Sequence, residues 1–246
     1  MKISIITAVF NRRDTIGDAL CSLHSQTHRS FEHVVVDGGS CDGTLAAVTA
    51  QADDRTVLLS EPDEGIYDAL NKGLDRATGD VVGLLHSDDL FAGDDVLKAV
   101  AMAFAADEPD AVYGDLDYVY RGDTSRVLRR WRSGDFKPSR LRYGWMPPHP
   151  ALFLRRAVVE RLGGYDTSFR IAGDYDAILR YFSTDGFRAT YIPDVLVKMR
   201  VGGESNRSPG RILRKSREDY RAIRKNGIGG VPTLVCKNLR KLGQFF

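Results

Sequence analysis

The first ninety residues alternate short apolar runs with amphipathic helical patterns. The apolar runs are rich in β-branched residues, which is typical of strands buried on both faces of a sheet. They occupy residues 3–10, 31–36, 57–59 and 81–85. Because the strands alternate with helices, the sequence predicts an α/β fold with a doubly wound, mostly parallel, Rossmann-like sheet.

Polar residues follow these strands and indicate where a ligand binds. Asp37, Glu61 and the pair Asp88-Asp89 come after the second, third and fourth strands. Open α/β sheets bind their ligands beyond the carboxyl ends of the strands, along one edge. One acidic loop would be ordinary turn chemistry, but three at the same edge favour a ligand site.

The adjacent carboxylates Asp88 and Asp89 indicate a cation. Neighbouring carboxylates repel, so the pair costs stability unless solvent or a cation relieves it. Oxygen ligands of this kind suit Mg²⁺ or Mn²⁺ held together with substrate phosphates. Capping of a following helix is the alternative, and it accounts better for Asp94-Asp95 than for Asp88-Asp89.

The glycine-rich loop over residues 38–43 is a weaker signal. Its glycines lack the G-x-G-x-x-G spacing of a dinucleotide-binding turn. Asp37 before the loop can accept hydrogen bonds from a base or a ribose, and a plain turn explains the same residues equally well.

The second half predicts an antiparallel addition and a basic end. Residues 111–120 and 125–131 are typical of a hairpin, and two basic helices are expected from Pro209 onward. We therefore predict one domain with a first half at 1–110 and a second half at 111–206, followed by a basic amphipathic helical tail at 207–246.

Charge is strongly segregated although the net charge is only +2. Residues 1–120 carry 8 Lys/Arg against 22 Asp/Glu, whereas the last forty residues carry 11 against 2. An acidic half that handles phosphates requires a metal, and a basic tail attracts anions.

Three widely spaced cysteines form neither a disulfide framework nor a zinc pattern, which indicates a reducing compartment. The apolar start is too short for a signal peptide, and no uncharged stretch reaches the ~20 residues of a membrane span. We expect a cytoplasmic protein.

Four motifs taken together resemble family 2 glycosyltransferases, in particular small bacterial enzymes of the colanic-acid and exopolysaccharide type. The motifs are residues 37–44 (DGGSCDGT), 61–73 (EPDEGIYDALNKG), 77–80 (ATGD) and 86–89 (HSDD). The resemblance implies a GT-A fold, a nucleotide-sugar donor, Mn²⁺ or Mg²⁺, and inversion at the anomeric carbon. The Gln-x-x-Arg-Trp signature of processive synthases is absent, which predicts transfer of one sugar per encounter.

The resemblance also implies that the half at 1–110 binds the donor and that the half at 111–206 holds the acceptor and the catalytic base. Seven residues would contact the donor: Thr7, Ala8, Asp37, Glu61, Asp68, Asn71 and Asp88. The first two would line the base pocket through backbone groups, Asp37 would hold the base or ribose, and Asp88 would lie in the ribose or metal shell. Asp89 would bind the metal that bridges the diphosphate.

The general base is expected in residues 173–180, which resemble the family's Glu-Asp motif at the head of a helix. Asp174 occupies the catalytic position, and Asp176 is its rival. In a helix the two point roughly 200° apart, so both cannot face one cleft equally. A helix N-cap is the alternative role for Asp174. Gly173 replaces the family's Glu, so the pair is incomplete here.

The histidines carry weaker expectations. His149, in a Pro-Pro-His-Pro loop, is a candidate for contact with acceptor or phosphate, and a structural loop role is equally compatible. His86 replaces a usual Asn beside the metal pair, where it would titrate near neutral pH. His24, His28 and His33 show no ligand spacing, and we expect them at the surface.

The tail suggests where the acceptor is found. A net charge of +9 with apolar residues at helical spacing, ending in Leu242 and Phe245-Phe246, predicts an amphipathic surface for an anionic membrane. We therefore expect a glycan or lipid-linked acceptor. We also expect a peripheral position at the inner face of the membrane. Nucleic acid is excluded because no recognition motif accompanies the charge.

Two other functions remain open on the sequence. A nucleotidyltransferase would need a glycine-rich basic loop after the first strand, and Asn11-Arg12-Arg13 lacks the glycines. A non-catalytic nucleotide-sugar-binding protein would have no need of an acid at position 174.

Overall fold

One curled β-sheet organises the chain, as a computed structural model that describes residues 1–202 and 209–240 shows. The strands are β1 (Ile3–Val9), β2 (Phe31–Asp37), β3 (Thr56–Ser60), β4 (Val81–Leu84), β5 (Asp89–Phe91), β6 (Ala111–Tyr120), β7 (Asp123–Trp131), β8 (Leu152–Arg155) and β9 (Ala189–Arg200). The helices are α1 (Arg13–His24), α2 (Thr44–Gln51), α3 (Ile66–Arg76), α4 (Val96–Asp107), α5 (Arg156–Leu162), α6 (Gly173–Phe182), α7 (Pro209–Lys225) and α8 (Val231–Arg240), with 3₁₀ turns η1 (Pro138–Tyr143) and η2 (His149–Ala151).

The strand order is β3-β2-β1-β4-β8-β6-β9-β5, with β7 paired to β6. The first four strands are parallel, which confirms the predicted α/β fold. The predicted antiparallel hairpin is present as β6 and β7, and β8 pairs antiparallel with β6 as well. The short strand β5 was not predicted. It pairs antiparallel with β9 and begins at Asp89, opposite Met199.

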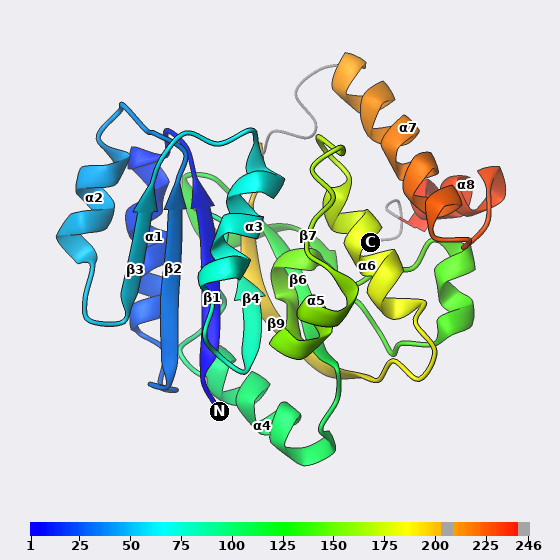
Figure 1. The fold of residues 1–246 in the computed structure, drawn as a ribbon, viewed down its shortest axis with the longest axis horizontal. Coiled ribbons are helices and arrows are strands. Elements are labelled where there is room, and N and C mark those ends of the chain that lie inside the picture. Colours follow the sequence, from blue (N-terminus) through cyan, green and yellow to red (C-terminus); the bar gives the residue numbers. More distant parts are fainter. Residues whose placement is uncertain (203–208, 241–246) are drawn as a thin grey trace.

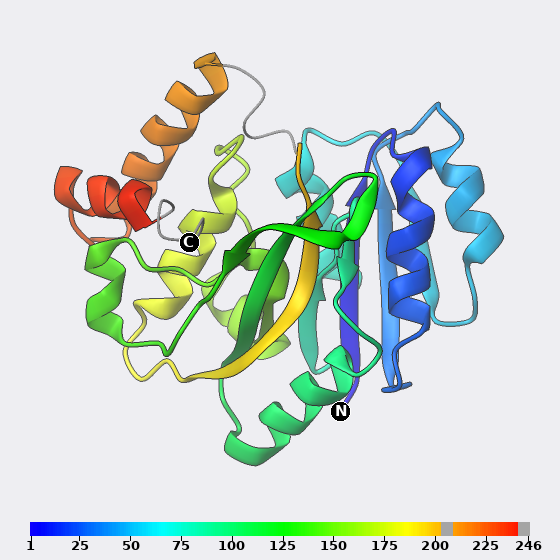
Figure 2. The ribbon, with the colours of Figure 1, turned by 180° about the vertical axis from the view of Figure 1, so that it is seen from behind.

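Helices cover both faces of the sheet (Figures 1 and 2). Helices α1 and α4 pack on one face, where Leu23, Leu97 and Phe104 join a buried cluster. Helices α3, α5 and α6 pack on the other face, around Leu70 and Phe182. The carboxyl ends of β1 and β2 point to the upper edge in Figure 1, as do the first turns of α3 and α6.

The C-terminal helices are part of this folded body. Two helices form where the basic tail was predicted, and α7 and α8 pack against α6 and η1. Ala222 and Ile223 of α7 are fully buried in the cluster that contains α6. Leu242 and Phe245-Phe246, which the membrane prediction used, lie outside the described residues.

Two further expectations can be checked directly. Cys21, Cys41 and Cys236 are free thiols. Over residues 1–202 and 209–240, no helix has both the length and the apolar character needed to cross a bilayer.

Candidate active site

The parallel register places the predicted donor residues at one sheet edge. Asp37 ends β2, level with Val9 at the end of β1 and with Ser60 at the end of β3. Its fully buried carboxylate accepts a hydrogen bond from Ser60 Oγ at 2.7 Å and one from the Ser40 N–H at 3.1 Å. Asp37 therefore fixes the turn of the glycine-rich loop, and its contact with a base or ribose stays a prediction.

Thr7 is tied into the sheet by its side chain. Its hydroxyl donates to the carbonyl of Leu85 at 2.7 Å and lies 2.9 Å from His33 Nε2. His33 is buried, not exposed as expected, because β2 lies between β1 and β3. Burial, followed by nearby His24, lowers the pKa of His33 to about 3. Ala8 is likewise buried, so any donor contact of this strand comes from its backbone.

Glu61 and Asp68 both form ion pairs with Lys72. Lys72 Nζ lies 3.0 Å from Glu61 Oε1 and 3.2 Å from Asp68 Oδ2. Glu61 precedes α3, Asp68 lies in its first turn and Lys72 lies one turn further along. The two carboxylates therefore reach the predicted edge, although each is neutralised in part by Lys72.

The side chain of Asn71 is hydrogen-bonded to the backbone of Tyr165. Its amide donates to the carbonyl of Tyr165 and accepts from the N–H of Tyr165, both at 2.8 Å. Both ends of the amide anchor the segment between α5 and α6, so the side chain is not directed at a nucleoside here.

Asp88 and Asp89 meet the electrostatic requirement for a cation. Asp89 is 1% exposed and accepts the N–H of Arg200 at 3.3 Å, while the Arg200 guanidinium donates to the Asp88 carbonyl and pairs with Asp18. Burial, with Asp88 as the second cause, raises the pKa of Asp89 well above its usual value. A divalent cation would stabilise the ionised form.

Within the part of the chain that the structure describes, no group of three His, Cys, Asp or Glu side chains surrounds a common point. Mg²⁺ is commonly held by one or two carboxylates plus substrate phosphates and water. The residues present therefore fit a divalent metal that arrives with a diphosphate.

Asp174, in the first turn of α6, has partners on both carboxylate oxygens. Oδ2 lies 3.0 Å from His149 Nδ1, and Oδ1 accepts the Tyr67 hydroxyl at 3.3 Å. The residue before α6 is Ala172, and no side chain caps the helix from that position. The helix N-cap interpretation of Asp174 is therefore not what the structure contains.

His149 also contacts His86, which lies shortly before Asp88 and Asp89 in the chain. His149 Nε2 lies 2.8 Å from Nε2 of His86, which follows β4 and is two residues before Asp88. One hydrogen must lie between these two nitrogens. A neutral His149 that donates from Nδ1 accepts a hydrogen bond from His86 at Nε2, whereas a charged His149 donates at both nitrogens.

The charges of this cluster follow from its surroundings. Burial, with His149 as the second cause, lowers the pKa of His86 to about 4. Burial would raise the pKa of Asp174, but the charge and hydrogen bond of His149, together with the charges of Lys215 and Lys237, hold that pKa well below its usual value. Asp174 is therefore an ionised carboxylate at neutral pH, as a general base must be.

Asp176 points elsewhere. It is fully buried, pairs with Lys225 Nζ at 3.0 Å and accepts from Asn226 Nδ2 at 3.0 Å. These partners lie at and just after the end of α7. Asp176 therefore docks α7 onto α6, and the structure brings Asp174, not its rival, to His149.

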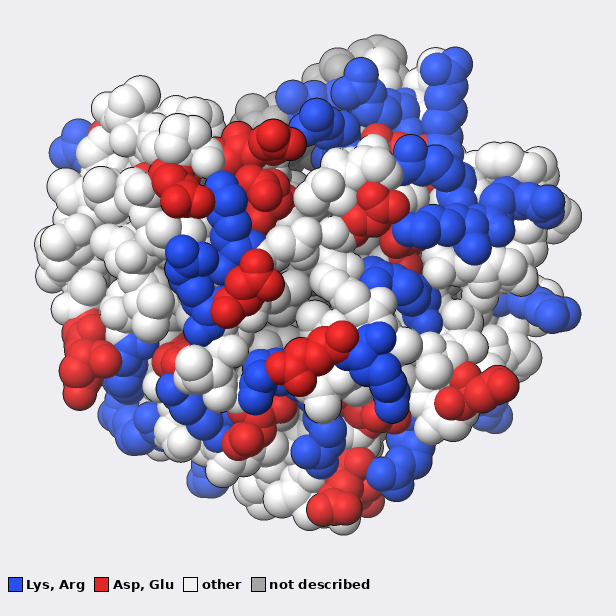
Figure 3. Space-filling view, in the orientation of Figure 1, with Lys and Arg blue, Asp and Glu red and all other residues white. Residues whose placement is uncertain are grey.

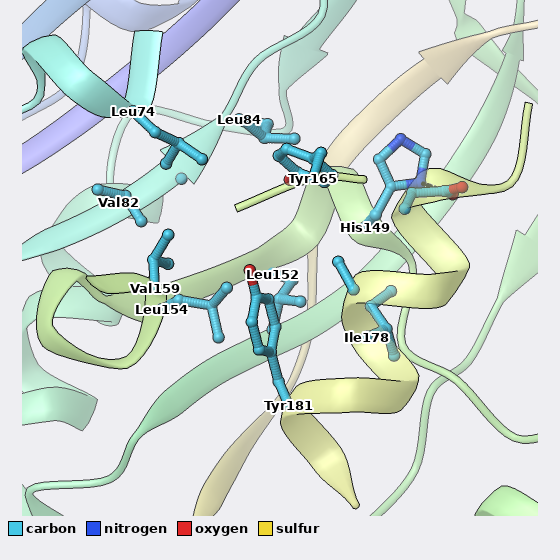
Figure 4. A pocket seen from close by; sticks show the side chains of 13 residues that line it. Leu74, Val82, Leu84, His149, Leu152, Leu154, Val159, Tyr165, Ile178 and Tyr181 are labelled. Carbon is cyan, nitrogen blue, oxygen red and sulfur yellow. Dashed lines mark ion pairs between the residues drawn. The ribbon is translucent and has the colours of Figure 1, made fainter. Parts of the chain in front are cut away.

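A pocket opens beside His149 and Asp174 (Figure 4). Apart from these two and the aromatic Tyr165 and Tyr181, its walls are aliphatic. The aliphatic side chains are Leu74, Val82, Leu84, Leu152, Leu154, Val159, Ala177 and Ile178. Walls of this kind keep water away from one side of the His149–Asp174 pair, which strengthens its electrostatics.

Tyr67 and His86 are the site residues that the sequence did not assign. Tyr67 lies inside the motif at residues 61–73, two residues after Gly65, but nothing local indicates that its hydroxyl reaches Asp174. The contact joins residues 107 positions apart, so only the fold reveals it. For His86, the signal in the sequence was the replacement of the usual Asn by His.

A mostly parallel GT-A sheet with carboxylates gathered at its strand ends defines a class of protein, the glycosyltransferases. The chain belongs to glycosyl transferase family 2, whose family model matches residues 4–163.

Two curated mycobacterial relatives support this assignment. An uncharacterized glycosyltransferase of Mycobacterium tuberculosis is 36% identical over 188 residues, which cover 72% of this chain and 68% of the relative. A PGL/p-HBAD biosynthesis glycosyltransferase of Mycobacterium bovis is 35% identical over 208 residues, or 82% and 78% of the two chains.

Solved structures agree on the fold. A mannosyltransferase from Pyrobaculum calidifontis, in complex with GDP-Man and Mn²⁺, superimposes with a TM-score of 0.68 at 25% identity, over 96% of this chain and 68% of that one. Residues 1–349 of TarS from S. aureus, in complex with UDP-GlcNAc, give 0.69 at 19% identity, over 93% and 66%. This chain spans 40% of the longer TarS chain.

Proposed function

We propose that the chain transfers one sugar from a nucleotide-sugar donor to an acceptor hydroxyl with inversion at the anomeric carbon, and that Asp174 is the general base. The observation that carries the proposal is the Asp174 carboxylate, held by His149 and Tyr67 and joined through His149 to His86, which lies between the end of β4 and Asp88-Asp89. This chain of contacts supports a base and a pair of metal-binding carboxylates that belong to one site.

The acceptor oxygen attacks the anomeric carbon, its proton passes to Asp174, and the bond between that carbon and the diphosphate oxygen breaks. Attack from the face opposite the leaving group inverts the configuration. A positioned base typically contributes 10²–10⁴-fold to such a step.

Asp88 and Asp89 would hold Mn²⁺ or Mg²⁺ against the donor diphosphate. When bound, the ion supplies charge neutralisation at the leaving group. The solved mannosyltransferase with GDP-Man and Mn²⁺ and the TarS fragment with UDP-GlcNAc support a nucleotide-sugar donor, and the former supports the metal. Asp37, Glu61 and the ends of β1 and β2 would bind the nucleoside.

The acceptor we propose is a lipid-linked or glycan precursor reached at an anionic membrane. Six apolar side chains of the C-terminal helices are between 38% and 59% exposed: Ile212, Leu213, Tyr220, Val231, Val235 and Leu239. Figure 3 shows Lys and Arg side chains gathered over α7, the helix that stands at the strand-end edge of Figure 1. Exposed apolar side chains beside basic ones suit an anionic bilayer surface, which each nearby cation favours by about 1 kcal/mol.

Membrane binding is tested best by substitution. Removal of residues 207–246 would also remove the buried Ala222 and Ile223. The triple variant Val231→Ser, Val235→Ser and Leu239→Ser should co-sediment less with anionic liposomes than the unmodified chain, and high salt should weaken both. Equal binding by the two chains, or none by either, would remove the idea.

Activity is tested with a panel of UDP- and GDP-sugars in Mn²⁺. The proposal expects release of nucleoside diphosphate from at least one donor, slowly to water and faster with acceptor. Release of pyrophosphate from nucleoside triphosphates would point to a nucleotidyltransferase. Tight donor binding with no release would point to a non-catalytic binding protein.

A further inference from the structure

One face of α7 carries three charged side chains spaced along successive turns. Glu218, Arg221 and Lys225 are three and four residues apart, so they lie on the same side of the helix. All three contact the segment over residues 166–172, which leads directly into α6 and Asp174.

Glu218 accepts three consecutive backbone N–H groups. Its carboxylate lies 3.1 Å from the nitrogen of Arg170, 2.8 Å from that of Ile171 and 3.0 Å from that of Ala172. Glu218 is 9% exposed, so these charge-assisted bonds are largely shielded from water. A negative charge at this end of α6 also complements the helix dipole.

The backbone N–H groups just before α6 lack a hydrogen-bond acceptor from their own helix. Helix α6 begins after Ala172 and has no side-chain cap of its own from that position. The side chain that would supply one in the first turn, Asp174, is directed to His149 and Tyr67. A carboxylate 46 residues further along the chain therefore orders the backbone that precedes α6.

Arg221 and Lys225 hold the same segment through their side chains. Arg221 donates to Ser168 Oγ at 2.9 Å and its guanidinium lies 3.6 Å from the ring centroid of Phe169. Lys225 Nζ lies 2.8 Å from Asp166 Oδ2 and 3.0 Å from Asp176 Oδ2. Helix α7 thus holds the segment before α6 at one turn after another.

We propose that Glu218 is a positioning residue for transfer: it fixes residues 170–172 and thereby the position of the Asp174 carboxylate relative to the anomeric carbon. The proposal rests on the proposed function, because it takes Asp174 as the base. It gives the C-terminal helices a role in turnover that is separate from any membrane contact. A purely structural cap would change stability without acting through Asp174.

The test uses the full chain with Glu218→Gln, which keeps the shape but removes the charge. Glu160→Gln is the matched control, since Glu160 is an exposed carboxylate of α5 paired only with Arg156 among the described ion pairs. Misplacement of the base should lower kcat of Glu218→Gln about 10- to 100-fold. The donor KM and all constants of Glu160→Gln should stay within about twofold of the unmodified chain.

A double variant separates positioning from a structural cap. In an Asp174→Asn background, Glu218→Gln should cost about twofold or less in kcat, because a residue that acts through Asp174 has nothing left to position. The same fold loss in both backgrounds, or an unchanged kcat in Glu218→Gln alone, would overturn the proposal. Glu218→Asp, which keeps the charge on a shorter arm, should fall between the two and serves if Glu218→Gln does not fold.

Amide hydrogen exchange gives a readout that does not depend on activity. The N–H groups of residues 170–172 should exchange faster in Glu218→Gln than in Glu160→Gln. Full activity of Asp174→Asn would sink the proposed function while this exchange result stood. Unchanged exchange in Glu218→Gln would sink the positioning role while the function of Asp174 stood.

Discussion

The ring of Tyr67 occupies the space that a side chain at position 173 would need. A Cβ built on Gly173 would lie 2.8 Å from both Cε2 and Cζ of that ring, well inside contact distance. The same ring carries the hydroxyl that donates to Asp174 Oδ1. Any side chain at position 173 would collide with this ring, so the glycine makes room for the Tyr67 contact with Asp174.

Gly173→Ala should therefore impair turnover more than folding. Tyr67 is 7% exposed and stacks on Tyr165 with ring centroids 5.6 Å apart, so it has little room to retreat. Displacement of the ring or of α6 would move Asp174, and a shift of about 1 Å can cost 10²-fold in rate. Steady-state kinetics with saturating donor checks this, with Gly210→Ala as control because nothing lies within 4 Å of a Cβ there. Unchanged kcat in Gly173→Ala would contradict the packing argument.

The partnership of His149 and Asp174 predicts a shift in pH dependence. His149 holds the pKa of Asp174 below its usual value against the opposing effect of burial. In His149→Gln that pKa should rise, so the acid limb of kcat/KM against pH should move to higher pH, because transfer requires the ionised carboxylate. A pH–rate profile of both proteins measures this. An acid limb that stays in place would show that His149 does not set the charge of Asp174.

Metal dependence should act on binding and turnover together. Asp89→Asn or EDTA should abolish transfer and weaken donor affinity, because the cation would contact the diphosphate that Asp88 and Asp89 face. Titration of donor with and without Mn²⁺, followed by calorimetry, checks the binding half. Full activity in chelator would remove the metal from the mechanism.

Buried His33 predicts acid sensitivity of the fold. Because its pKa is lowered to about 3, protons bind the unfolded chain preferentially below its ordinary value of 6.5. The free energy of unfolding should therefore fall as pH drops from 6.5 toward 3, by up to about 1.4 kcal/mol per pH unit from this group alone. Urea unfolding at pH 7 and pH 5 measures the loss, and His33→Gln should reduce it. An equal loss in that variant would assign the acid sensitivity to other groups.

The strands that carry the site were predictable because their patterns are local. The runs at residues 31–36 and 81–85 are largely apolar, and the acidic residues Asp37 and Asp88-Asp89 that follow them are ordinary sequence neighbours. Parallel pairing then brings Asp37 and the end of β1 to one edge without further information. The choice of Asp174 over Asp176 was left to the resemblance, since helix geometry alone said only that both cannot face one cleft.

What could not be predicted depends on contacts between distant segments. His149 meets His86 across 63 residues and Glu218 meets Ala172 across 46, and neither pair leaves a periodic trace in the chain. The short strand β5 is three residues long, too short to show alternation, and pairs with β9 more than a hundred residues later. His33 was misplaced because a lone histidine in a strand looks the same whether the strand is central or exposed.

The central claim, that Asp174 is the base, is tested most directly by comparing Asp174→Asn with Asp176→Asn. For Asp174→Asn we predict a kcat at least about 100-fold lower with unchanged donor affinity, the pattern of a group needed in the transition state. Asp176→Asn should lose far less of its kcat and mainly lower the melting temperature, because it leaves Lys225 without its buried partner charge. The reverse pattern, with kcat lost in Asp176→Asn and kept in Asp174→Asn, would contradict the account.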